Sequence, residues 1–267
     1  MKKYKIAIIT AFIGDGGATG ELTFTADSQA QLDAYGFDIY RFSNDDLELL
    51  KTYLKPNLNK EDLVKERPKH KLYHIFNRIW YNQKQFPSKE DNQTRLIAKI
   101  PKMLFCKLIP QEYDYYIWLD SKFTIHKHWL DYVLWLISNH EFYDIITSKH
   151  SDRNSVKDEV NFMLGHIKNE NKGMCEKYVG VDIARQYELY KNKFVDNRLF
   201  ELTMIIYSNK IVSKENFLEE WYAHNYYYSI QDQLSFAYLI NKHRINVWQI
   251  PQYVFNMPFT EHEYGIK

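Results

Sequence analysis

Cysteine is scarce in this sequence: Cys106 and Cys175 are the only two among 267 residues. Their spacing matches no pattern of metal ligands, and two distant cysteines do not form the framework of a disulfide-rich domain. The sequence therefore predicts a protein of a reducing compartment.

Net charge and long apolar runs are also lacking. The formal net charge is +1, which gives no electrostatic basis for general nucleic-acid binding. No segment is long and apolar enough to predict a transmembrane helix. The start, MKKYKIAIITAFIG, places lysines before an apolar run, but that run is short, β-branched and followed by Gly-Asp-Gly-Gly, unlike a signal peptide. We interpret it as a first strand and predict a cytoplasmic protein. This location is compatible with peripheral association of the protein with the cytoplasmic face of the membrane.

Glycine motifs for nucleotides are missing as well. The loop 14–20 is glycine-rich but contains neither the GxGxxG nor the Walker pattern. A strand followed by a glycine loop is common at nucleotide sites and also common where nothing binds. Thr10, Ala11 and Phe12, at the end of a predicted strand 5–13, are candidates for cradling the base of a nucleotide donor.

The remaining pattern is typical of an α/β fold. Hydrophobic residues make up 45% and charged residues 26% of the chain, as in globular proteins. Runs of β-prone residues alternate with helical segments, which predicts a sheet flanked by helices. Strands are expected at 5–13, 37–42, 115–119, 144–147, 199–207 and 247–250. The length fits a single domain over 1–267, with 43–90 interpreted as a loop-rich insertion that covers a site.

The segment Tyr113–Ile125, YDYYIWLDSKFTI, is the centre of this organisation. Its aromatic and branched run predicts a buried strand, and the run stops at Asp120-Ser121-Lys122. Ligands of open α/β sheets bind outside the carboxyl ends of strands, so these three residues are candidates for donor binding. A solvated turn is the commoner explanation of an isolated D-x-K, and the neighbouring motifs must decide.

The segment 92–108 predicts an amphipathic helix with a basic face. Arg95, Lys99 and Lys102 recur at three- and four-residue spacing, so they can share a face. Arg95 and Lys99 are candidates for binding a diphosphate, although a solvated face is equally compatible. Pro101 is expected to break or kink the helix.

Other polar groups fall at the ends of predicted strands, within one strand or at the starts of helices. They are His150, Arg153, Glu159, Glu201, Gln231 and Asp232. These types suit a transferase with an anionic nucleotide donor. A carboxylate can hold a divalent cation on the diphosphate, basic residues neutralise the leaving group, and another carboxylate positions or deprotonates an acceptor hydroxyl.

Four segments occur in an order that resembles a known family: AKIPKMLFCKLIPQEYDYYIWLDSKFTI, HSDRNSVKDEV, LFELTMIIYSN and SIQDQLSFAYLINK. Over residues 92–245 the chain resembles the glycosyltransferase-like family that includes plant mucilage-related galacturonosyltransferases, long classed as a domain of unknown function. The resemblance implies a GT-A-like nucleotide-binding sandwich with a central mixed, mostly parallel sheet flanked by helices. It also implies a hexosyl- or uronosyltransferase that uses a nucleotide sugar, foremost a UDP-sugar, and a glycan or glycolipid acceptor.

The resemblance also implies roles for single residues. Asp120 matches the first acid of a DxD-like site, which contacts the ribose or a metal, whereas Lys122 stands where many GT-A enzymes have the second acid. Asp232 matches the acidic residue that faces the acceptor. An inverting enzyme would use it as general base, and a retaining one would use it only for positioning. Gln231 replaces the arginine expected beside it.

Further matches remain without a fixed role or depend on a metal. His150, Arg153 and Glu159 match a polar loop of the family, and Glu201 matches its F-E block. His262 is a candidate for the late histidine that completes a metal site, with Asp120, for Mn²⁺ or Mg²⁺. Because a lysine can itself neutralise a diphosphate, Lys122 leaves dependence on that cation open.

Two alternatives come from other classes. A strand followed by D-x-K is also half of a metal-dependent nuclease signature, which needs another acid from a preceding strand. Upstream, Asp91 lies in a predicted loop, and Glu112 and Asp114 are too close to Asp120. The other alternative is a non-catalytic nucleotide- or carbohydrate-binding domain, which turnover of a donor would distinguish from an enzyme.

Overall fold

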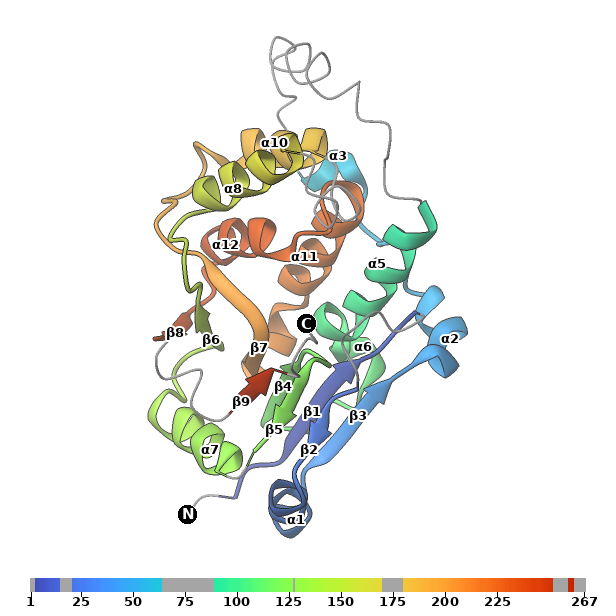
Figure 1. Cartoon of the computed structure of the whole chain (residues 1–267), viewed down its shortest axis with the longest axis vertical. Coiled ribbons are helices and arrows are strands. Elements are labelled where there is room, and N and C mark those ends of the chain that lie inside the picture. Colours follow the sequence, from blue (N-terminus) through green and yellow to red (C-terminus); the bar gives the residue numbers. More distant parts are fainter. Residues whose placement is uncertain are drawn as a thin grey trace.

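The computed structural model describes residues 3–14, 21–63, 89–126, 128–169, 180–251 and 259–261. Within these residues the strands form a six-stranded sheet and a small three-stranded sheet (Figure 1). The large sheet contains, in spatial order, β3 (Asp38–Phe42), β1 (Ile6–Ala11), β4 (Tyr115–Leu119), β7 (Phe200–Ser208), β6 (Ile145–Lys149) and β8 (Val247–Ile250). The small sheet contains β2 (Thr23–Phe24), β5 (Phe123–Ile125) and β9 (Phe259–Glu261).

The large sheet is mixed and mostly parallel. Strand β1 pairs in parallel with β3 and β4, and β6 pairs in parallel with β8, whereas β7 runs antiparallel to both of its neighbours. All residues of β1 and β4 are buried, as expected for strands that are covered on both faces. The predicted α/β fold with a mixed, mostly parallel sheet is confirmed.

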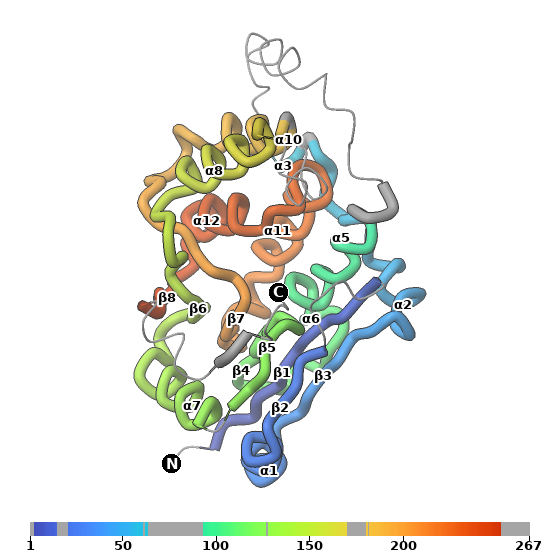
Figure 2. Tube along the Cα trace, in the orientation of Figure 1, coloured from blue at the N-terminus to red at the C-terminus, as the bar shows by residue number. Residues whose placement is uncertain are grey.

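Helices cover both faces of this sheet. The described helices are α1 (Ala26–Tyr35), α2 (Leu47–Lys51), α3 (Lys60–Leu63), α5 (Lys89–Met103), α6 (Phe105–Leu108), α7 (Trp129–Asn139), α8 (Val156–Lys168), α10 (Gly180–Tyr190), α11 (Glu215–Tyr227) and α12 (Asp232–Lys242), with the 3₁₀ turns η1 (Asn44–Asp46) and η2 (Asn209–Lys214). One core cluster joins the sheet to α5, α6, α8 and α10–α12, and the other joins it to α1 and α7. Figure 2 shows α1 and α7 at one end of the molecule and α8, α10 and α12 at the other.

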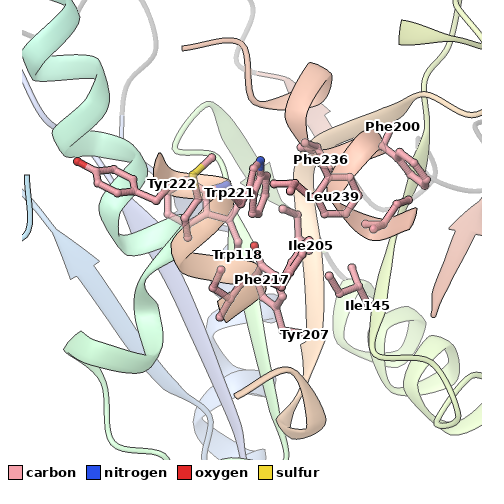
Figure 3. Packing of buried hydrophobic residues seen from close by; sticks show 14 of the residues in the cluster. Trp118, Ile145, Phe200, Ile205, Tyr207, Phe217, Trp221, Tyr222, Phe236 and Leu239 are labelled. Atoms are coloured by element: carbon pink, nitrogen blue, oxygen red, sulfur yellow. The ribbon is translucent and has the colours of Figure 1, made fainter. Parts of the chain in front are cut away.

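The larger core is strongly aromatic. In Figure 3, Phe217 and Trp221 of α11 lie against Phe236 of α12 and the side chains of β7. The rings of Trp221 and Phe236 are 4.9 Å apart between centroids. Burying rings of this size supplies much of the hydrophobic stabilisation of a domain. Part of the high aromatic content is therefore explained by this core.

Helix α5 places the basic residues because its apolar stripe packs on the sheet. Ile100 and Met103 are fully buried in the core cluster, and α5 contacts β1. Of the break or kink expected at Pro101, the break does not occur: α5 continues through this residue to Met103, and the Leu104 N–H donates to the Ile100 carbonyl at 2.7 Å. Proline removes its own N–H and leaves the later donors of the helix in place.

Other expectations were met in part. Helix α1 lies in a stretch for which no helix was predicted. Val160 and Met163 of α8 are buried, whereas Phe162 is 41% exposed. The described part of the predicted insertion contains η1, α2 and α3, and its residues 64–88 lie outside the described ranges. None of the described helices combines the length and apolarity needed to cross a bilayer.

Candidate active site

The predicted site residues converge on one edge of the large sheet. In the parallel pairing of β1 and β4, Ile9 is opposite Trp118, so Thr10–Phe12 and Asp120 leave the sheet side by side. The Asp120 N–H donates to the Thr203 carbonyl of β7 at 2.9 Å. On the far side of β7, the His150 N–H donates to the Leu199 carbonyl at 3.0 Å. The carboxyl ends of β1, β4 and β6 thus meet at this edge.

A buried ionic cluster lies at the centre of the site. Lys99 and Lys102 extend from α5 to the same oxygen, Oδ2 of Asp232, at Nζ–O distances of 2.9 and 2.7 Å. The side chains of Lys102 and Asp232 are only 6% and 10% exposed. Asp232 begins α12, where a carboxylate also interacts favourably with the positive end of the helix dipole. The cluster therefore consists of two ammonium groups and one carboxylate, largely shielded from water.

Asp120 and Trp118 complete this cluster, which we call the lysine–aspartate cluster and define as Lys99, Lys102, Trp118, Asp120 and Asp232. The Trp118 Nε1–H donates to Asp120 Oδ1 at 2.7 Å. The Lys102 ammonium lies 5.7 Å from the centroid of the Trp118 ring. Two lysines and two aspartates balance in formal charge. An anionic ligand that enters here would meet cations that are already desolvated and positioned.

The ionic contacts perturb proton affinities within the cluster. Burial opposes the charged form of Asp232, but the two lysines outweigh it and hold the pKa of its carboxyl group well below the usual range. Burial lowers the pKa of the Lys99 ammonium, and the neighbouring Lys102 adds to this effect against the attraction of Asp232. Asp232 is therefore a carboxylate at neutral pH, and a weak proton acceptor while both lysines hold it.

A second polar cluster adjoins the first through α12. We call it the histidine–arginine cluster: His150, Arg153, Glu159, Gln231 and Gln233. Arg153 forms an ion pair with Glu159, whose other oxygen accepts from Gln231 Nε2 at 2.8 Å. Gln231 also donates to Gln233 Oε1 at 2.7 Å. Since Gln231 precedes Asp232 in the chain, the two clusters share one helix start.

His150 is fixed in its loop. Its Nδ1 accepts from the backbone N–H groups of Asp152 and Arg153 at 3.1 and 3.2 Å. Burial, followed by the charge of Arg153, lowers the pKa of the imidazole. Glu201 occupies β7 opposite Ser148 of β6, where the register of the two strands shifts, and is half-buried. These residues form a rigid polar wall on the β6 side of the site.

Four buried polar side-chain atoms at this edge lack a hydrogen-bond partner. They are the hydroxyl oxygens of Thr10, Ser148 and Thr203 and the Nη1 atom of Arg95. Arg95 belongs to the same helix as Lys99, beside the loop that follows β1, because the neighbouring Thr94 approaches Gly14. Buried polar groups are normally hydrogen-bonded in native proteins. Orphaned groups at this edge indicate a place where a polar ligand or water completes the structure.

The turn after β4 presents Asp120, Ser121 and Lys122, all half-buried. The Lys122 ammonium lies 5.3 Å from the ring centroid of Phe123. Ala11 ends β1 and Phe12 follows it, with the Phe12 N–H donating to the Phe42 carbonyl at 2.8 Å. The predicted donor-binding residues of β1 and β4 are thus neighbours, and their role remains a prediction.

Of the two predicted metal ligands, Asp120 is the one that the described residues contain. One oxygen of Asp120 already accepts from Trp118, and Lys122 occupies the position of a second acid. The residues described contain no group of three or more His, Cys, Asp or Glu that could hold a metal ion. His262, the other predicted metal ligand, lies outside the described ranges.

Two members of the site were not among the residues singled out from the sequence. Lys102 was noted only as part of a basic face, and Trp118 only as part of a strand. The three-residue spacing of Lys99 and Lys102 was a usable signal, because it placed both amines on one side of α5. That this side faces Asp232 rather than water requires the tertiary packing of α5 against α11.

Comparison with known proteins gives one family. Residues 76–264, well over half of the chain, match the model described as TOD1/MUCI70, glycosyltransferase-like domain. The matched range includes both polar clusters. Comparison with curated proteins gives no significant match.

Several solved structures are distantly similar. The apo form of mouse xyloside xylosyltransferase 1 is 11% identical, with 92% of this chain and 84% of that chain covered and a TM-score of 0.42. The apo WbbM bifunctional glycosyltransferase is 14% identical, with 93% and 39% covered and a TM-score of 0.47. Core-mannan synthase A from Aspergillus fumigatus, in a Mn/GDP form, is 9% identical, with 88% and 69% covered and a TM-score of 0.38. Similarity at this level carries no information on donor or acceptor.

Proposed function

Because the chain belongs to the TOD1/MUCI70 glycosyltransferase-like domain family, we propose that it transfers a hexosyl or uronosyl unit from a UDP-sugar to a hydroxyl of a glycan or glycolipid. The family match contains the whole range 92–245 on which the resemblance was based, so the predicted family is confirmed. The observation that carries the proposal is the buried pair of lysines beside Asp120 at the carboxyl edge of the sheet.

The lysine pair supplies what departure of a nucleoside diphosphate needs. In the transfer, a bond forms between the acceptor oxygen and the anomeric carbon while the bond from that carbon to the phosphate oxygen breaks. The leaving diphosphate takes the electron pair, and its growing negative charge is stabilised by positioned cations in a site shielded from water. Lys99 and Lys102 fit this role, and no step of it requires a metal.

Asp232 is proposed to position the lysines and to respond to the donor. In the structure it holds both ammonium groups on one oxygen. A diphosphate that takes over these hydrogen bonds removes the cause of the low carboxyl pKa, so the proton affinity of Asp232 rises when the donor binds. Which of the two expected roles Asp232 has, positioning or general base, therefore depends on whether the donor is bound. If Asp232 acts as general base during turnover, the anomeric configuration is inverted. If it acts only in positioning, the configuration is retained.

The nucleoside is proposed to occupy the β1 side of the edge. Arg95 provides an orphaned polar atom on the α5 face of the sheet there and Thr10 one on the other face, and Asp120, which follows the neighbouring strand β4, is proposed as a ribose contact. The acceptor is then left with the β6 side, where the histidine–arginine cluster and Glu201 offer both donors and acceptors of hydrogen bonds. With the donor on the β1 side and the acceptor on the β6 side, the sugar would be transferred at the lysine–aspartate cluster between them, which contains Asp232.

The test is a binding panel of UDP-, GDP- and CMP-sugars, with and without Mn²⁺, on the wild type and on Lys102→Met. A UDP-sugar is expected to raise the melting temperature of the wild type through preferential binding to the folded state. In Lys102→Met its affinity should fall about ten- to hundredfold, because one charge-assisted hydrogen bond to phosphate is lost. Lys157→Met, which changes an exposed lysine of α8, should keep wild-type affinity.

Other outcomes would contradict the proposal. Equal affinity of wild type and Lys102→Met would remove the lysine pair from the donor site. Binding without transfer or hydrolysis of the donor would favour the non-catalytic domain. Cleavage of DNA or RNA that depends on Asp120 would favour the nuclease, although Asp114, one of the acids considered for it, lies at the opposite end of β4 from Asp120.

We further propose that the protein works in the cytoplasm, in part at the inner face of the membrane, where glycan precursors with lipid carriers are accessible. The support is the low cysteine content of the sequence alone. Cell fractionation should place the protein in the soluble fraction together with a salt-releasable membrane fraction. Recovery outside the cell would contradict this.

A further inference from the structure

We propose that the opposite edge of the sheet carries a second, non-catalytic binding site for a neutral sugar unit. A pocket of about 270 Å³ lies there, lined by Tyr4, Asp114, Tyr115, Glu141, Phe142, Ser208, Asn209 and Lys210. These residues precede β1, β4 and β6, follow β7, or are the first residue of β4 (Tyr115) and the last of β7 (Ser208). We call it the lower pocket.

The lower pocket is separate from the candidate active site. Asp114 and Asp120 bracket β4, so the two sites lie about 20 Å apart at roughly 3.3 Å per residue of strand. The buried body of the sheet fills the space between them, because all residues of β4 are buried. A ligand in the lower pocket therefore cannot be the donor in the lysine–aspartate cluster.

The aromatic walls of the pocket fit the apolar face of a pyranose ring. The rings of Tyr4 and Tyr115 form an edge-to-face pair, 5.3 Å apart between centroids. Phe142, in the loop between α7 and β6, is 78% exposed, the largest value among the described large hydrophobic residues. An exposed ring beside a concave polar surface offers an apolar face on which a sugar ring can stack.

The polar lining fits hydroxyl groups. Asp114 is held in place by the Lys5 N–H, which donates to its Oδ2 at 2.8 Å. The Lys210 ammonium donates to the Glu141 backbone carbonyl at 2.9 Å. Burial and the neighbouring Tyr4, Glu141 and Asp114 raise the pKa of Tyr115 to about 12, so its hydroxyl keeps its proton and can donate. Carboxylates that accept and groups that donate match the dual nature of a sugar hydroxyl.

The charge of the pocket selects among ligands. Two carboxylates and one ammonium line it, which disfavours phosphate and uronate through like-charge repulsion. Its acids are too few for a metal site, since the residues described hold no group of three suitable ligands. The small volume, below that of typical drug-sized sites, accommodates one sugar unit. A neutral pyranose at the end or side of a longer glycan is the ligand class that fits the charge of the pocket, its small number of acids and its volume.

Saturation-transfer NMR titrations with methyl glycosides of xylose, galactose, glucose and mannose test this inference. At least one is expected to bind with millimolar affinity, and Phe142→Ala should weaken that binding about tenfold or more. Tyr35→Ala, which removes an exposed ring outside the pocket, should leave it unchanged. Lys102→Met should also bind the glycoside normally, which separates this site from the proposed donor site.

Three results would overturn the inference. The first is that no neutral glycoside binds up to its solubility limit. The second is equal affinity of wild type and Phe142→Ala, and the third is tighter binding of galacturonate or inorganic phosphate than of any neutral glycoside. None of these depends on whether the protein transfers sugars, and Phe142→Ala should retain the affinity of the wild type for its nucleotide.

Discussion

Replacing Asp232 with asparagine is expected to lower the free energy of unfolding by about 3–5 kcal/mol at pH 7, because two buried ammonium groups lose their common counterion. Lys102 is 6% and Lys99 19% exposed on their side chains, so neither can regain full hydration without moving α5. Urea denaturation followed by circular dichroism measures the change. Asp33→Asn, at an exposed position of α1, should alter the stability by less than about 0.5 kcal/mol.

The pH dependence of the same variant has a definite sign. Without Asp232, the folded-state pKa of Lys99 lies further below its ordinary value of 10.5, because burial and the charge of Lys102 are no longer opposed by that carboxylate. The unfolded state then binds more protons than the folded state, so stability rises with pH as a lysine loses its proton. Between about pH 7 and 10 the variant should therefore recover part of the lost stability relative to the wild type.

A double variant tests the coupling between Asp232 and Lys102. Asp232→Asn combined with Lys102→Met leaves Lys99 and Asp120, one charge of each sign, so its cost should be smaller than the sum of the two single costs by at least about 1 kcal/mol. Additive costs would show that the contacts contribute no net coupling. In that case the lysine–aspartate cluster is solvated in solution, and the proposal for the donor site loses its basis.

The sequence was sufficient to place candidate functional residues at the ends of strands and the starts of helices. It was not sufficient to predict which of these residues contact one another. The buried run Tyr115–Leu119 and the change to Asp120 located the edge of the sheet, because a strand that is covered on both faces leaves a continuous apolar signature. Asp232 was expected in the first turn of a helix, and α12 begins at this residue. These features depend on neighbours in sequence.

What could not be predicted depends on contacts between distant segments. Lys102 and Asp232 are 130 residues apart, and nothing in either segment specifies that they meet. The same holds for Gln231 and Glu159, which join α12 to α8. Helix α1 was missed for a local reason: its buried residues are only Ser28 and Leu32, too few to give an apolar stripe.

Away from the candidate site, the buried carboxylate of Glu220 in α11 links three helices. One carboxylate oxygen is paired with Lys242 and lies 3.4 Å from His224 Nε2, and the other lies 2.6 Å from His243 Nε2. The hydrogen-bond network continues through His224, because its Nδ1 lies 2.5 Å from the Tyr190 hydroxyl of α10. Burial lowers the pKa of His224 and raises that of Tyr190, so the neutral imidazole accepts from the hydroxyl and donates to Glu220.

Replacing Glu220 with glutamine should lower the free energy of unfolding by about 2–4 kcal/mol at pH 7, somewhat less than for Asp232 because the Lys242 side chain can turn to water. Glu219→Gln is the matched control. It lies next in the same helix and pairs with Lys107, with both side chains 20% exposed, so its cost should be about 1 kcal/mol or less.

The difference between wild type and Glu220→Gln should depend on pH in one direction. Its histidine and lysine partners hold the pKa of Glu220 well below its ordinary value of 4.5, against the opposing effect of burial. The stabilisation is therefore complete above about pH 4.5 and decreases as the pH falls below this value, where the unfolded state takes up the proton first. Denaturation curves from pH 7 down to the acid limit should show the two proteins converging. A constant gap would mean that Glu220 acts through its shape and hydrogen bonds, and not through its charge.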